Sequence, residues 1–267
     1  MTNLTPARRM GLRAPPWALA AACAICASNP SKAATSYDLR TDWSDNSNPN
    51  GVWSYRAGNV VLPHVANWTL DTFSSPQGGW GNGESIPFWF RSSATPLSTA
   101  HDWQLGDVVV HTQDNNNGLG NGPANVVWTS PSAATVSIAG GVWEGREIAD
   151  LGGGLRGNTW SLYLDNTLLS SGVVRGGDPY SRTNPFTFDL GSGGPGVLQN
   201  LRVGAGDQIR LELDRTGIEG DYVGVSLGIT VVPEPSSLGV AGAGVALGIL
   251  RLKRRRGCLS PGLNAIR

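Results

Sequence analysis

The chain has 267 residues, with 20 basic and 20 acidic side chains, 37 Gly, 10 Trp and 3 Cys. The balanced charge hides an uneven distribution, because half of the basic residues lie near the two ends. Residues 33–232 hold 10 Arg, no Lys and 19 acidic residues, which gives this central part a charge of about −9. A surface of that sign disfavours binding to nucleic acid and to anionic lipid.

The first 33 residues have the organisation of a secretory signal peptide. Three arginines between positions 8 and 13 form a charged region, and an apolar run follows over 17–27. The run is too short to span a bilayer as a permanent helix. Small side chains at Ser31 and Ala33 predict cleavage after Ala33.

The cysteines agree with an exported protein. Cys23 and Cys26 lie in the leader and Cys258 lies near the C-terminus, so the central body contains none. Such a domain is expected to hold together without disulfides in an oxidising compartment. Lipidation at Cys23 is an alternative, but Ala20 stands three positions before it, where Leu is usual.

From Tyr37 onward, short apolar alternations separated by Gly, Asn, Asp, Pro and Ser predict β-strands. The expected strands are 108–112, 124–129, 135–139, 160–164, 185–190, 208–213 and 222–230. Asp165 and Asn166 tolerate positive φ, so they predict a hairpin turn. Apart from the two ends, no window of helical length shows the three- and four-residue apolar spacing of a helix. The pattern predicts an all-β fold, an antiparallel sandwich of jelly-roll type.

The first part of this body, residues 37–103, is rich in Trp and poor in clear strand alternation. Its tryptophans are Trp43, Trp53, Trp68, Trp80, Trp89 and Trp103. Nothing resembling a linker separates it from the more regular part that follows. We therefore predict one domain over residues 34–231, with irregular strands and loops at its start.

The end of the chain joins three unlike segments. Pro233, Glu234 and Pro235 interrupt any regular element, because proline fixes φ and lacks a backbone donor. Residues 238–250 carry no polar side chain, and with their flanks they reach about 17 residues, the lower limit for crossing a hydrocarbon core of roughly 30 Å. The basic cluster that follows consists of Arg251, Lys253, Arg254, Arg255 and Arg256. It predicts a transmembrane helix with its C-terminus in the cytoplasm.

These three segments, in this order and spacing, resemble the PEP-CTERM sorting signal of exported Gram-negative bacterial proteins. The resemblance implies recognition near Val232, Pro233, Glu234 and Pro235 by an exosortase, a membrane-embedded processing enzyme that removes the helix. Members are often surface or extracellular-matrix proteins made beside exopolysaccharide, as in a biofilm.

The predicted organisation is thus a signal peptide over 1–33, a β-sandwich over 34–231, a sorting signal over 232–257 and a cytoplasmic tail over 258–267. The tail extends beyond the point where the family usually stops. The alternative is a permanent tail anchor that is not processed.

Two further stretches resemble known proteins. Residues 37–55 look like the opening of a group of PEP-CTERM extracellular proteins. Residues 205–211, Ala-Gly-Asp-Gln-Ile-Arg-Leu, are similar to the turn before a late strand in many jelly-roll carbohydrate-binding modules. Neither resemblance implies a catalytic residue.

The body shows no recognisable catalytic motif. No two of its three His residues have metal-ligand spacing, and no nucleophile elbow or phosphate loop is present. A glycosidase would need two carboxylates across a cleft, separated by about 5 to 10 Å. The glutamates available for such a pair are Glu144, Glu147, Glu212 and Glu219. We therefore predict a protein that is not an enzyme, with a secreted glycoside hydrolase as the alternative.

Sugar binding is the favoured function, with exopolysaccharide as the partner. Sugar rings stack on flat aromatic faces, and Trp offers the largest face. Trp80 in a glycine-rich loop, Trp89 between two Phe and Trp143 beside Glu144 are the candidates, whereas Trp128 is assigned to the core. No cofactor is expected, although a structural calcium ion remains an alternative at residues 42–46 or 114–117, where oxygen ligands concentrate. A purely structural envelope protein is the third possibility.

Overall fold

The computed structural model describes residues 34–68, 76–83, 85–93, 101–114, 122–146, 148–149 and 152–232. The chain divides into two compact units, and the unit Ala33–Glu234 holds all of these residues. The predicted leader, the Pro-Glu-Pro segment, the hydrophobic run and the basic cluster lie outside them. Within the described part of the chain, no helix is long and apolar enough to cross a membrane.

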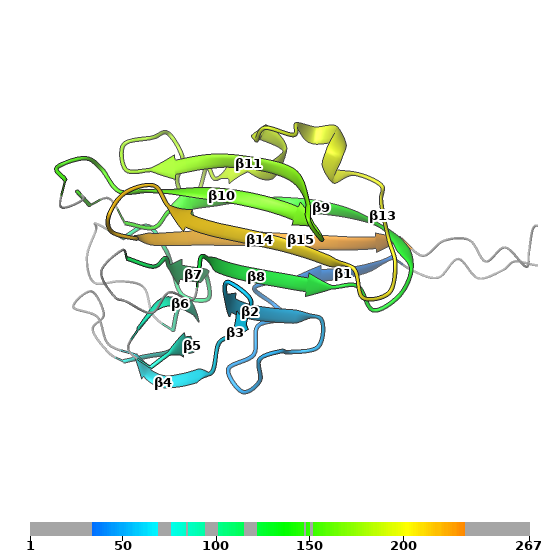
Figure 1. Cartoon of the computed structure of the whole chain (residues 1–267), viewed down its shortest axis with the longest axis horizontal. Helices are drawn as coiled ribbons and strands as arrows, with labels where there is room; N and C mark the ends of the chain where they lie inside the picture. Colours follow the sequence, from blue (N-terminus) through cyan, green and yellow to red (C-terminus); the bar gives the residue numbers. More distant parts are fainter. Residues whose placement is uncertain are drawn as a thin grey trace, which may run out of the picture. The chain divides into compact units, whose positions relative to one another are not determined.

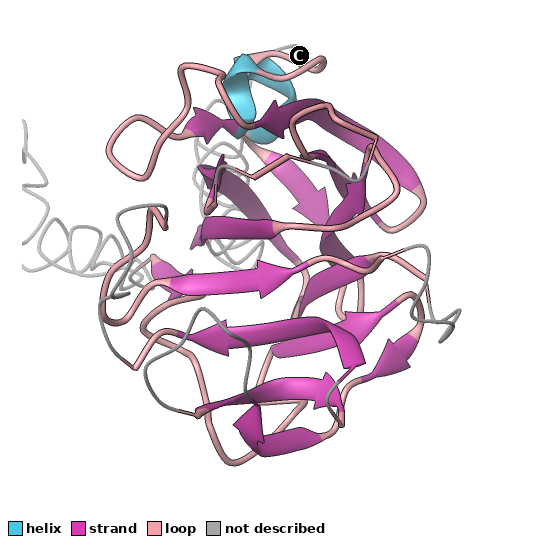
Figure 2. Ribbon diagram, turned by 90° about the vertical axis from the view of Figure 1, so that its left-hand side faces the viewer, coloured by secondary structure: helices cyan, strands magenta, loops and turns pink. Residues whose placement is uncertain are grey.

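The described residues form an all-β domain of two antiparallel sheets (Figures 1 and 2). The first sheet has the order β12 (Phe186–Thr187), β9 (Ala134–Glu144), β15 (Tyr222–Val232), β7 (Val108–His111), β6 (Ser85–Arg91), β5 (Gln77–Asn82) and β4 (His64–Trp68). In addition, β1 (Thr35–Asp38) pairs with β15, and β13 (Leu201–Val203) pairs with β9.

The second sheet has the order β11 (Thr167–Arg175), β10 (Gly157–Leu164), β14 (Gln208–Arg215), β8 (Ala124–Thr129), β2 (Trp53–Ala57) and β3 (Val60–Val61). Two short 3₁₀ helices, η2 (Phe188–Leu190) and η3 (Pro195–Leu198), follow β12. The strands β2 to β6 therefore extend both sheets on the side of β7 and β8 (Figure 1).

Alternation of apolar and polar residues produces β14, one of the strands that were predicted from the sequence. In β14, Ile209, Leu211 and Leu213 are fully buried, while the residues between them are only partly covered. Successive side chains of a strand point to opposite faces, so these three enter the space between the sheets. The predicted turn between β10 and β11 is also present, with Asp165 at φ 51°.

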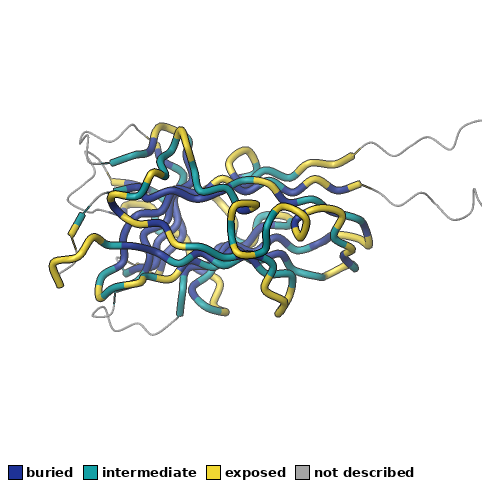
Figure 3. The backbone as a smooth tube through the Cα atoms, turned by 90° about the horizontal axis from the view of Figure 1, so that it is seen from above, coloured by how far each residue is buried: buried dark blue, intermediate teal, exposed yellow. Residues whose placement is uncertain are grey.

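The core lies between the two sheets (Figure 3). Its largest side chains include Trp53, Trp128 and Trp160, each at most 1% exposed, so the assignment of Trp128 to the core is confirmed. A second apolar cluster contains Trp68, Ile86, Phe88, Phe90, Trp103, Val109 and Tyr222. Strand β6 contributes Trp89 to the first cluster and its two Phe to the second. It is therefore buried on both faces, which explains why its sequence does not alternate.

The two ends of the domain meet. Thr35 of β1 pairs with Val231 of β15, and Asp38 pairs with Gly228. Strand β1 thus begins at the end of the sandwich where β15 finishes (Figure 1). The segments that join the domain to the predicted leader and to the chain's C-terminal part attach at neighbouring positions.

Candidate functional site

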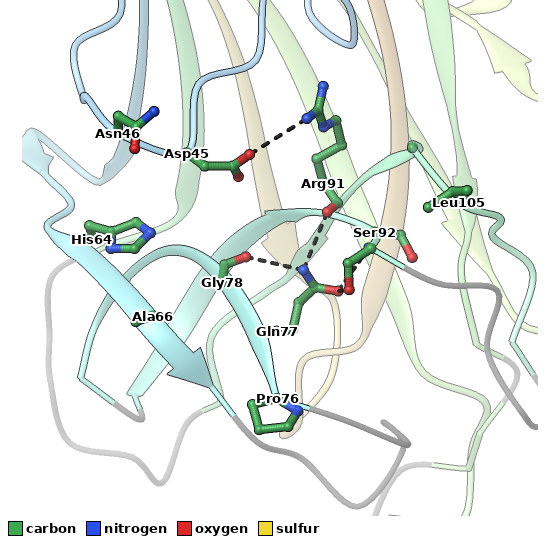
Figure 4. Close-up of a pocket in the computed structure, with 12 residues that line it drawn as sticks. Asp45, Asn46, His64, Ala66, Pro76, Gln77, Gly78, Arg91, Ser92 and Leu105 are labelled. Atoms are coloured by element: carbon green, nitrogen blue, oxygen red, sulfur yellow. Dashed lines mark hydrogen bonds and ion pairs between the residues drawn. The ribbon is translucent and has the colours of Figure 1, made fainter.

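A pocket of about 550 Å³ opens beside the strands that extend the first sheet (Figure 4). It is lined by Asp45, Asn46, His64, Ala66, Pro76, Gln77, Gly78, Arg91, Ser92, Ser93, Leu105 and Gly106. These residues come from β4, β5, the end of β6 and two loops. Pairing of β4 with β5 and of β5 with β6 brings the strand residues together.

Gln77 holds two walls of this pocket together through its side-chain hydrogen bonds. Its buried amide donates to the carbonyl oxygens of Gly78 and Arg91, each at 3.3 Å. The Oε1 atom accepts hydrogen bonds from the backbone N and the Oγ of Ser93, both at 3.1 Å. The side chain therefore fixes β5 to the segment that follows β6, and its polar atoms are already used.

The accessible polar groups of the pocket include an ion pair, an imidazole and the exposed amide of Asn46. Arg91 Nη2 lies 3.5 Å from Asp45 Oδ2, and the two side chains are 38% and 54% exposed. An exposed pair of this kind adds little stability, so both groups remain available to a ligand. His64 is exposed, and its ring meets Trp80 edge-on with centroids 5.2 Å apart. The pocket thus offers a carboxylate, a guanidinium and an imidazole within one recess.

The three tryptophans predicted as sugar platforms lie elsewhere. Trp80, Trp89 and Trp143 are 2%, 0% and 4% exposed, so none offers a ring face to solvent, contrary to the expectation from the sequence. Trp80 and Trp89 pair across β5 and β6 and face the core. Trp80 Nε1 also donates to the Ser44 carbonyl at 3.1 Å.

Trp143 is buried on the other face of the first sheet. Its ring lies against Gly224, where an added Cβ would be 2.0 Å from Trp143 Cε2. Its Nε1 donates to the Asp102 carbonyl at 2.6 Å. It borders a recess of about 190 Å³ together with Asp38, Arg40, Asp107, Val225, Ser226 and Leu227.

The glutamates considered for a hydrolase do not gather in the pocket. Glu212 lies on β14 with its Oε2 atom 3.8 Å from Arg210 Nε, and Glu219 is ion-paired with Arg156. Glu144 is buried at the end of β9, and Glu147 lies outside the described residues. Among the described residues that line the pocket, Asp45 is the one carboxylate.

The loops considered for calcium use their carboxylates in hydrogen bonds. Asp42 Oδ2 accepts from the backbone N of Asp38 and from Trp53 Nε1, and Asp45 Oδ1 accepts from Trp43 Nε1. Residues 115–117 are outside the described ranges. Among the residues that the structure describes, no group of three or more His, Cys, Asp or Glu is placed to hold a metal ion.

A family model, the PEP-CTERM protein-sorting motif, matches residues 231–256. The chain carries a PEP-CTERM sorting motif. The match includes the predicted processing segment Val232–Pro235 and the basic cluster up to Arg256. A PEP-CTERM motif implies an exported protein that is processed by an exosortase and is transiently anchored in the membrane. In this PEP-CTERM protein the motif begins at the end of β15.

Comparisons with curated proteins and with solved structures identify no further family. No curated protein matches the chain. The crystal structure of a cyclase from Fischerella sp. TAU is similar to 76% of this chain and 100% of that chain, with 11% sequence identity and a TM-score of 0.34. A likeness of this size carries no conclusion about fold or activity.

Proposed function

We propose that this PEP-CTERM protein is a cell-surface or extracellular-matrix component whose sandwich binds polysaccharide in the pocket beside β4, β5 and β6. The observation that carries this proposal is the combination of an export motif with an open, polar pocket of about 550 Å³. This volume falls in the range of roughly 300 to 1,000 Å³ that is typical of ligand sites.

The lining suits a sugar better than a charged or a purely apolar ligand. Asp45 accepts and Arg91 donates hydrogen bonds, so together they match the mixed donors and acceptors of neighbouring sugar hydroxyls. Pro76 and the 60% exposed Leu105 provide apolar surface for the C–H faces of a ring. Because Asp45 and Arg91 already balance one another, the pocket favours a neutral glycan.

In this proposal the protein binds the glycan and does not hydrolyse it. Acid–base cleavage of a glycosidic bond uses two carboxyl groups on opposite sides of the bond. Asp45 has no carboxylate partner among the described residues that line the pocket. We therefore expect no release of reducing ends from any polysaccharide that the protein retains.

A jelly-roll topology is part of the same proposal. Strands β7, β15, β9 and the β12–β13 segment are neighbours in one sheet, and β8, β14, β10 and β11 are neighbours in the other. From β7 to β15 the chain changes sheet at each connection except β10–β11 and β12–β13. This strand order supports a jelly roll, which is built from two Greek keys. Jelly rolls are common among lectin domains, which is compatible with binding a glycan.

The test is retention of the purified exported protein on a panel of soluble and insoluble polysaccharides. Arg91→Ala removes one charged side chain from the pocket. Arg202→Ala removes the same charge from an exposed position on β13 and is the matched control. We expect the wild type and Arg202→Ala to be retained on at least one glycan, and Arg91→Ala to bind at least tenfold more weakly. No retention on any glycan, or equal retention of both variants, would contradict the proposal.

A further inference from the structure

A layer of polar side chains closes the end of the sandwich opposite the paired termini. Strands β7, β15 and β9 are neighbours, and in their register His111 pairs with Tyr222 while Val223 pairs with Glu144. Thr112, Asp221 and Glu144 therefore point to the inner face, because each lies two residues from an inward-facing Val. Those valines are Val110, Val223 and Val142. The polar layer thus directly caps the apolar core.

Hydrogen bonds join this layer to the opposite sheet. Asn158 of β10 is fully buried, and its Oδ1 accepts from Thr112 Oγ1 at 2.7 Å. Its Nδ2 donates to Glu144 Oε2 at 3.4 Å. The backbone N of Asp221 donates to Thr112 Oγ1 at 3.1 Å. Four buried polar residues from four strands or strand ends are therefore connected.

Two carboxylate oxygens of the layer are left over. Glu144 is 7% exposed and Asp221 is fully buried. In the described part of the chain, neither Glu144 Oε1 nor Asp221 Oδ2 has a hydrogen-bond partner. A buried carboxylate oxygen without a partner is costly, so these two oxygens have free capacity to accept a ligand.

The surrounding charges do not compensate this pair. Burial and then the charge of Asp221 raise the pKa of Glu144 well above its usual value. Burial raises the pKa of Asp221 to about 7, although Tyr222 donates its backbone N–H to Oδ1. Arg156 acts on both groups, but its guanidinium already contacts Glu219 and the Gly220 carbonyl.

The charged groups around this pair balance one another. The charges that act on Glu144, Asp221 and neighbouring His111 from outside are Asp114, Asp178, Arg146 and Arg156. His111 stays neutral, because burial lowers its pKa to about 4. Two acidic groups thus offset the two arginines, and Glu144 and Asp221 remain as a local excess of two negative charges when both are ionised.

We infer that Glu144 and Asp221 hold a calcium ion through Glu144 Oε1 and Asp221 Oδ2 at this end of the sandwich. Calcium takes six to eight oxygen ligands, including amide and backbone carbonyl oxygens and water, so two carboxylates are sufficient as its charged ligands. A zinc ion would need His or Cys in a closed tetrahedral set, which the described residues do not offer here. The ion would neutralise the buried charge and connect β9 with β15.

The site is distinct from the pocket proposed for polysaccharide. None of the residues of the polar layer lines that pocket. The two proposals therefore fail independently. A failure of calcium binding would not change the test of glycan retention with Arg91→Ala, and a failure of glycan retention would not change the test of calcium binding.

The experiment measures the Tm of the purified exported protein in calcium, in magnesium and in a chelator. Because an ion that binds only the folded state stabilises it, calcium at about 100 times its Kd is expected to raise the Tm by roughly 5 to 10 °C. Glu144→Gln and Asp221→Asn remove one charged ligand each while keeping the shape. Glu212→Gln makes the same change on β14, where the side chain is only partly buried, and is the control.

The expected result is a calcium-dependent rise in Tm for the wild type and Glu212→Gln, which is lost in Glu144→Gln and Asp221→Asn. A second measurement needs no variant: terbium luminescence of the wild type should report one calcium-displaceable ion per chain. A wild-type Tm that calcium leaves unchanged, a shift that both ligand variants keep, or no displaceable terbium would overturn the inference.

Discussion

At the scale of single residues, the face of a strand decides what each tryptophan does. Trp80 follows two glycines, and this setting is equally typical of an exposed loop ring and of a core ring under a tight strand. Pairing of Trp80 with Trp89 turns both toward Tyr55, whose ring is parallel to that of Trp80 at 6.4 Å. The sequence could not distinguish the two cases, because the register of β5 and β6 is not visible in their composition.

Replacement of Trp80 tests this reading. We expect Trp80→Ala to reduce the free energy of unfolding by about 3 to 5 kcal/mol, because it leaves a large cavity in the core. The exposed His64→Ala next to it should change stability by less than about 0.5 kcal/mol. Urea unfolding measures both. A Trp80→Ala protein with wild-type stability and no glycan retention would show that Trp80 is a ligand platform after all.

At the scale of elements, the sequence predicted the strands from residue 108 onward better than the irregular strands before it. The predicted strands 208–213 and 222–230 correspond to β14 and β15 with small shifts at their ends. Strand β6 has two buried faces and β5 contains three glycines, so neither shows the alternation that defines a strand in sequence. The predicted strand 185–190 is wrong beyond Thr187, where the chain turns into η2.

The pocket could not be predicted for a related reason. Asp45, His64 and Arg91 come from a loop, from β4 and from β6, and nothing in their spacing marks them as neighbours. They meet because β5 lies between the two strands and because the loop after β1 reaches the same side. Motif spacing identifies sites within one element, whereas this pocket depends on the order of strands.

The turn between β10 and β11 provides a test at this scale. Asp165 has φ 51°, and its Oδ1 accepts a hydrogen bond from the backbone N of Gln208 at 2.8 Å. We expect Asp165→Val to lose about 1 to 2 kcal/mol of unfolding free energy, because a β-branched residue is strained at positive φ. Asp165→Asn should be close to wild type in the same denaturant titration. Equal stability of the two variants would contradict the turn geometry.

At the scale of the whole molecule, the folded domain fits between the two expected processing points. Strand β1 begins at Thr35, directly after the predicted cleavage at Ala33, and β15 ends at Val232, directly before Pro233. Removal of both ends would therefore leave every described strand complete. The sorting motif over residues 231–256 explains why the sequence indicates the destination of the protein more clearly than its ligand.

The intact mass of the surface form is the most direct test of this account. We predict a chain that begins near Ala34, ends close to Pro233–Pro235 and lacks residues 238–250, recovered from the cell surface or the medium. A surface form that retains residues 238–250, or a full-length chain found only in the cytoplasm, would contradict it.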